Sequence, residues 1–74
     1  MITYEDALKK AKELKPSIDT CSETEDGFVF SNSKTNDVFG GDQPCVILKE
    51  TGEAINHLHF VLNYKSEELR KIAI

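Results

Sequence analysis

The sequence predicts a small α+β domain in which a helix covers one face of an antiparallel, four-stranded meander sheet. The first fifteen residues repeat apolar positions at helical spacing, and residues 17–64 contain four strand-like segments divided by turn residues. Residues 66–73 begin with a helix-capping residue and continue with an apolar edge, which predicts a short helix there. The predicted order is therefore αββββα, in a single domain over residues 1–74.

The first segment should form a helix that begins after Thr3 and ends before Pro16. The Thr3 hydroxyl can cap the first turn, with Asp6 three residues later as in a capping box. A residue that precedes proline avoids the helical conformation, which predicts the end of the helix. One buried stripe is expected from the apolar positions Tyr4, Ala7, Leu8, Ala11 and Leu14.

A hairpin is expected next, with strands at 17–23 and 28–31 and a turn at 24–27. Phe28 and Phe30 lie two residues apart, so on a strand both rings point to the same side. These rings are large and apolar, and they should lie in the core beneath the first helix.

The second half should add two strands and a short helix. The continuous apolar segment 45–49 predicts a central strand, and a turn at 50–53 leads into the longest strand at 54–64. A short helix at 66–73 follows. The first helix would then cover the sheet face formed by Phe28, Phe30, Leu58 and Phe60, whereas the opposite face of the last strand would carry Ile55, His57, His59 and Val61.

Charge and hydropathy exclude several classes of partner. The net charge of −4 opposes binding to the phosphate backbone, so no nucleic-acid partner is expected, whereas a basic protein is a suitable partner. The longest apolar run is 45–48, which is too short to span a membrane. The first residues show no basic segment followed by an apolar one, so we expect no secretory signal and a cytoplasmic protein.

The two cysteines, Cys21 and Cys45, are expected to be reduced and buried. They do not form the closely spaced pair typical of metal or redox sites. In a meander they flank the middle strand and lie about 9–10 Å apart, which is too far for a disulfide.

The pair His57 and His59 is the part of the sequence that most suggests a metal site. On a strand, both imidazoles would project to the same face and could reach one metal ion, but no further ligand is placed to complete the site. We therefore expect no metal, no cofactor and no enzyme activity; a metal-dependent enzyme using these two ligands is the rival hypothesis. If a second copy of the chain covers this open sheet face, the two histidines become interface residues of a homodimer.

The long connection at 34–44 is the predicted contact surface. Such loops are often functional, and this one places acids beside apolar residues: Asp37, Val38, Phe39 and Asp42. The apolar pair could also turn inward and cap the open end of the core. Both roles remain open, and they are compatible with each other.

Several short motifs together resemble the immunity protein 35 (YrhB-like) family. These are YEDA at 4–7, GFVF at 27–30, GGDQP at 40–44, CVIL at 45–48 and TGE at 51–53. Phe28 stands where that family often has tryptophan.

The resemblance implies a small bacterial cytoplasmic protein that binds and neutralises a polymorphic toxin, without catalysis. A chaperone-like role is an alternative that the same resemblance implies. A PepSY-type inhibitory domain has a similar order of elements, a helix followed by hairpins. Those domains are typically exported or attached to membranes, which this chain is not expected to be.

Overall fold

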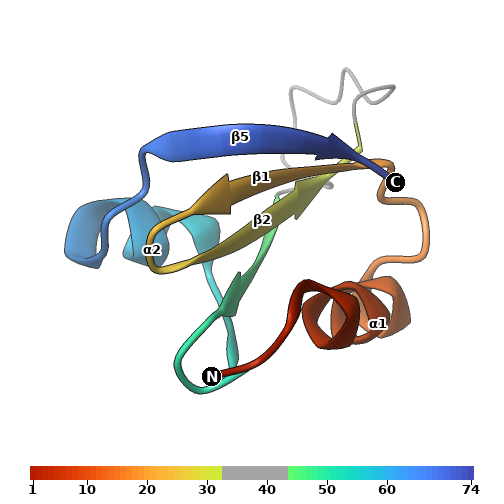
Figure 1. The fold of residues 1–74 in the computed structure, drawn as a ribbon, viewed down its shortest axis with the longest axis horizontal. Coiled ribbons are helices and arrows are strands. Elements are labelled where there is room, and N and C mark those ends of the chain that lie inside the picture. The colour runs from red at the N-terminus through yellow and green to blue at the C-terminus, as the bar shows by residue number, and fades with distance from the viewer. Residues whose placement is uncertain (33–43) are drawn as a thin grey trace.

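A computed structural model of the chain, which describes residues 1–32 and 44–74, shows an α+β fold (Figure 1). All the strand pairs are antiparallel, and the sheet has five strands in the order β4-β3-β2-β1-β5. The elements are α1 (Tyr4–Leu14), β1 (Thr20–Thr24), β2 (Gly27–Ser31), β3 (Cys45–Leu48), β4 (Ala54–Ile55), α2 (His57–Asn63) and β5 (Glu68–Ala73). The predicted fold class is confirmed, but the predicted four-stranded sheet and the order αββββα are wrong.

Helix α1 begins and ends as predicted. The Thr3 hydroxyl accepts a hydrogen bond of 3.2 Å from the backbone N–H of Asp6, and the helix stops at Leu14, two residues before Pro16. Ala7 and Ala11 are fully buried against the sheet, so small side chains allow the helix a close approach. The prediction that Leu14 belongs to the buried stripe is wrong, since this last residue of the helix is 55% exposed.

The predicted hairpin is confirmed, although β1 begins at Thr20 and not at residue 17, and the turn is shorter than the predicted 24–27. Its turn is closed by the buried Thr24, whose hydroxyl donates to the carbonyl of Gly27 and accepts from the N–H of the same residue, each at 3.0 Å. Phe28 and Phe30 are both buried on the α1 side, where Tyr4 contacts both rings. The prediction that these two rings lie in the core is confirmed.

The sheet separates two apolar clusters because alternate residues of each strand point to opposite faces. The larger cluster lies under α1 and includes Phe28, Phe30 and Ile47, whereas Val46 and Leu48 belong to a smaller cluster together with Phe60 of α2. Figure 1 shows α1 beneath one end of the sheet and α2 at the other.

The predicted strand 54–64 is wrong beyond its first two residues. The side chain of Asn56 accepts hydrogen bonds from the N–H groups of Leu58 and His59, at 2.8 and 3.2 Å, and so starts α2 where the strand was expected to continue. Leu58 was expected in the core beside the phenylalanine rings and is instead 63% exposed. Phe60 is buried, but in the cluster that α2 forms and not under α1.

The predicted helix at 66–73 is also wrong, because this segment forms the edge strand β5. An isolated eight-residue helix is only marginally stable, whereas β1 offers a free edge that satisfies the backbone of β5. Ile72 lies opposite Cys21 and packs against the larger core cluster. The register shifts between Glu23 and Thr24, which marks a local irregularity in this pair.

Both cysteines are buried and free, as predicted. Cys21 and Cys45 each pair with Phe30 of β2, from opposite sides. Two strand spacings of about 4.8 Å therefore separate them, beyond the reach of a disulfide.

No helix in the described part of the chain is long and apolar enough to cross a membrane.

Candidate functional site

Three connections meet at the end of the molecule beside α2, and Asp26 holds them together. The carbonyl of Asp26 accepts a 3.0 Å hydrogen bond from the N–H of Lys49, which follows β3. Its carboxylate accepts a 2.7 Å bond from the N–H of Lys65, which lies between α2 and β5. One residue of the hairpin turn thus fixes both neighbouring connections.

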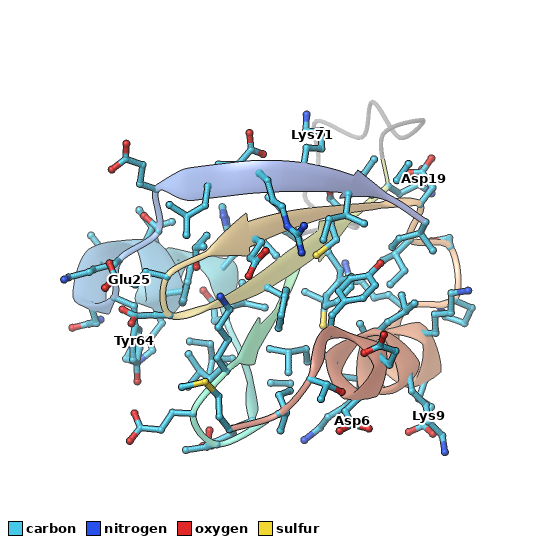
Figure 2. All side chains as sticks on the ribbon, viewed as in Figure 1. Asp6, Lys9, Asp19, Glu25, Tyr64 and Lys71 are labelled. Atoms are coloured by element: carbon cyan, nitrogen blue, oxygen red, sulfur yellow. The ribbon has the colours of Figure 1, made fainter. Side chains whose placement is uncertain are left out.

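These connections enclose a hollow of about 270 Å³, which we call the turn hollow. It is lined by Met1, Glu25, Asp26, Leu48, Lys49, Glu50, Thr51 and Tyr64. Figure 2 shows Glu25 and Tyr64 at this same end of the molecule, beside α2. The hollow therefore combines acidic, basic, apolar and aromatic side chains.

The cations near the turn hollow are largely engaged by acids. The Lys49 ammonium lies 2.9 Å from the Glu23 carboxylate and 5.1 Å from the centre of the Phe28 ring, and Lys65 lies 3.5 Å from Glu25. Among the residues that the structure describes, the carboxylates of Asp26 and Glu50 form no ion pair. The negative charges of Asp26 and Glu50 are thus not neutralised by a neighbouring cation.

Helix α2 presents an apolar surface to solvent, formed by Leu58, Val61 and Leu62, which we call the α2 apolar surface. These side chains are 63%, 44% and 71% exposed, and their spacing places them on one side of the helix. The opposite side holds Phe60, which is fully buried and stacks on Tyr64 with ring centres 5.6 Å apart. Contiguous exposed apolar side chains of this kind commonly mark interaction surfaces.

The structure places His57 and His59 on α2 and not on a strand, so the expectation that they share one face is wrong. Residues two apart on a helix point about 200° away from each other, so the two imidazoles do not converge on one ion. His59 instead contacts Asn63, whose side-chain nitrogen lies 3.2 Å from Nδ1 of His59. In residues 1–32 and 44–74, no group of three His, Cys, Asp or Glu residues is arranged to hold a metal.

The other predicted contact residues, Asp37, Val38, Phe39 and Asp42, lie outside the described residues. Their contact role stays a prediction.

Burial makes the two thiols poor nucleophiles. Desolvation, with a smaller contribution from the nearby Glu23 carboxylate, raises the pKa of Cys21 to about 12. Burial likewise raises the pKa of Cys45. Because the thiolate is the reactive form, neither cysteine is suited to nucleophilic catalysis at neutral pH.

Two of the motif glycines have structural roles. A Cβ atom at Gly27 would lie 2.9 Å from the carbonyl oxygen of Ile47 and 3.2 Å from the Phe60 ring. Gly52 has a φ of 74°, and its carbonyl accepts a 2.6 Å bond from the Lys10 ammonium. The GFVF and TGE motifs are therefore explained here by packing and by turn geometry.

The sequence interpretation missed the α2 apolar surface because it assigned 54–64 to a strand. A signal was present, since Asn56 is a good helix cap and Leu58, Val61 and Leu62 follow at helical spacing. The turn hollow depends on contacts between distant segments and had no sequence signal.

Comparisons with models of protein families, with curated proteins and with solved structures found no match to this chain.

Proposed function

We propose that this chain is a non-catalytic protein-binding domain that contacts its partner through the α2 apolar surface. The observation that carries the proposal is the exposure of Leu58, Val61 and Leu62 on a helix whose other side is anchored in the fold. Covering these side chains would remove apolar area from water at about 25 cal/mol per Å². A helix with three such positions offers more than the scattered single apolar residues of an ordinary surface.

The α2 apolar surface is held rigidly, which lowers the entropic cost of binding. Phe60 anchors the helix in the smaller core cluster, and the Asn56 side chain caps its first turn with two hydrogen bonds. A partner therefore meets a helix that is already formed.

The charge of the chain favours a basic partner. The net charge is −4, and the acids Glu25, Asp26 and Glu50 gather at the end of the molecule that also carries α2. Opposite charge speeds the encounter of two proteins. Together with the resemblance to immunity proteins, these features support neutralisation of a basic toxin domain in the bacterial cytoplasm.

The test is to coexpress the chain with any toxin domain found encoded beside its gene and to measure protection of the bacteria. The double variant Leu58→Glu/Leu62→Glu should lose protection and purified-complex formation, because it places charges where the partner contacts apolar carbon. Leu14→Glu is the matched control, since Leu14 is 55% exposed on the other helix. If the double variant folds by circular dichroism and still protects, the α2 apolar surface is not the contact site.

The connection at 34–44 is a second proposed contact region. A variant that combines Phe39→Asp with Asp42→Lys should weaken protection in the same assay. Unchanged protection by this folded variant would remove Asp37, Val38, Phe39 and Asp42 from the proposed interface.

A homodimer is the second candidate, because the same exposed leucines can cover each other in two copies of the chain. Sedimentation velocity decides this point. A concentration-dependent dimer that Leu58→Glu/Leu62→Glu dissociates would support self-association, whereas a monomer at millimolar concentration would exclude it.

A further inference from the structure

We propose that the turn hollow receives an arginine side chain of the protein partner. The inference rests on the proposed function and deepens it, because it specifies what the partner presents beside the α2 apolar surface.

The size of the turn hollow suits a single long side chain. Its volume of about 270 Å³ lies just below the lower limit of about 300 Å³ for small-molecule sites. Hot spots of protein interfaces commonly consist of one arginine or aromatic anchor inserted in such a space.

Its walls fit the two parts of an arginine. Leu48 and Met1 supply apolar surface for the aliphatic stem, and Tyr64 supplies an aromatic ring. Tyr64 is 39% exposed as a residue, and its ring stacks on Phe60 at an interplanar angle of 16°. A guanidinium group stacks well on such a ring.

The charge balance favours a cation. The lining of the hollow carries the carboxylates of Glu25, Asp26 and Glu50 and two cationic groups, the Lys49 ammonium and the amino group of Met1. Three negative groups against two positive ones leave the hollow net negative. A planar guanidinium can bond to carboxylates on two sides at once, which a point-like ammonium does less well.

The hollow is also formed before binding, since backbone hydrogen bonds fix its walls. The N–H of Ile2 bonds to the carbonyl of Lys49 at 2.9 Å, and the bonds of Asp26 to Lys49 and Lys65 fix the other sides. Tyr64 is the C-cap residue of α2, so the hollow lies directly beside the helix that carries the α2 apolar surface. One partner segment can therefore reach both.

The test uses a small probe, Nα-acetyl-arginine amide, titrated into the ¹⁵N-labelled 74-residue chain and followed by NMR. We expect saturable shifts at the amides of Asp26, Leu48, Glu50 and Tyr64. The matching citrulline amide has nearly the same shape without the charge and should bind about tenfold more weakly. Equal binding of the two probes, or no saturable shift with arginine, would overturn the proposal.

Variants locate the binding site. Glu50→Gln and Asp26→Asn keep the shape of each side chain, and Asn can still accept the hydrogen bond from Lys65. Each should weaken arginine binding about threefold, as expected for exposed ion pairs. Glu13→Gln, on α1, should leave it unchanged. If Glu50→Gln and Asp26→Asn both bind arginine as the parent does, the hollow is not the site. Because no partner protein is present in this titration, that outcome leaves the proposed function of α2 to its own test.

Discussion

At the scale of single residues, Glu23 links β1 to β5 and to the turn that follows β3. Its carboxylate lies on β1 and accepts hydrogen bonds from the Lys49 ammonium, which follows β3, at 2.9 Å and from Nε of Arg70 on β5 at 2.6 Å. These two bonds lower the pKa of Glu23 below its ordinary value of 4.5. The glutamate therefore ties the edge strand to the centre of the sheet.

This contact should make stability depend on acid pH. The folded-state pKa of Glu23 is lowered, so the unfolded chain takes up the proton first, and the contribution is lost as the pH falls below 4.5 through the folded value. Urea unfolding at several pH values should show that acid lowers the free energy of unfolding less in Glu23→Gln than in the parent. Glu53→Gln serves as the control, because Glu53 is exposed and forms no ion pair in the described chain. Parallel pH profiles for the parent and Glu23→Gln would contradict the assignment.

Gly27 should tolerate no side chain. In Gly27→Ala the new Cβ would meet the Ile47 carbonyl at 2.9 Å, and backbone there cannot move freely within the sheet. We expect a loss of about 1–3 kcal/mol in the free energy of unfolding, as for other overpacked sites. Urea denaturation measures it, with the exposed Glu25→Ala in the same turn as control. A variant as stable as the parent would show that this packing is looser than described.

The thiols should react only when the protein opens. Cys21 and Cys45 are buried, and burial raises both pKa values. If access requires global unfolding, a free energy of about 5 kcal/mol slows labelling by roughly 10³-fold or more. Ellman's reagent, added with and without denaturant, measures the ratio. Rapid labelling of both thiols in buffer would contradict their burial.

At the scale of elements, α2 depends strongly on its cap. A seven-residue helix is too short to be stable alone, so its position relies on Phe60 and on the two hydrogen bonds of the Asn56 side chain. The same helix carries the proposed contact surface. Local stability and binding are therefore linked at this element.

Asn56→Ala should lower the free energy of unfolding by about 1 kcal/mol, because two N–H groups lose their acceptor. Asn56→Asp should largely retain stability, since aspartate caps as well. Urea denaturation measures both variants, and partner binding should weaken in parallel for the alanine variant. If alanine and aspartate behave alike, the cap is not what holds α2.

At the scale of the whole molecule, acids and exposed apolar carbon occur at the same end. Charge acts mainly on the rate of encounter, whereas apolar contact acts mainly on the lifetime of the complex. The two kinds of substitution should therefore affect different rate constants.

The association rate with a basic partner should fall about tenfold between roughly 50 and 500 mM salt, because salt screens the attraction. The Leu58→Glu/Leu62→Glu variant should instead raise the dissociation rate. Surface plasmon resonance separates the two constants. A salt-independent association rate would show that the net charge of −4 does not guide this encounter.

The order of elements shows where local signals were sufficient. The cap at Thr3 and the stop at Pro16 predicted α1, and Gly27 with the alternating Phe28 and Phe30 predicted the first hairpin. Each of these signals acts within a few residues, by capping, turn geometry or alternation. Local physical chemistry decides such elements, and the structure agrees with them.

What the sequence alone determined is thus the α+β class, α1, the first three strands and the buried rings; tertiary contacts decided the rest. Residues 54–64 fit both strand alternation and helical spacing over so short a length, and the end of the chain fits both as well. The free edge of β1 pairs with β5, and Phe60 packs against the face of β3. Each ambiguous segment therefore adopts the secondary structure that buries its apolar side chains and satisfies its backbone hydrogen bonds. The turn hollow and the α2 apolar surface follow from those two choices, which depend on residues far apart in the chain.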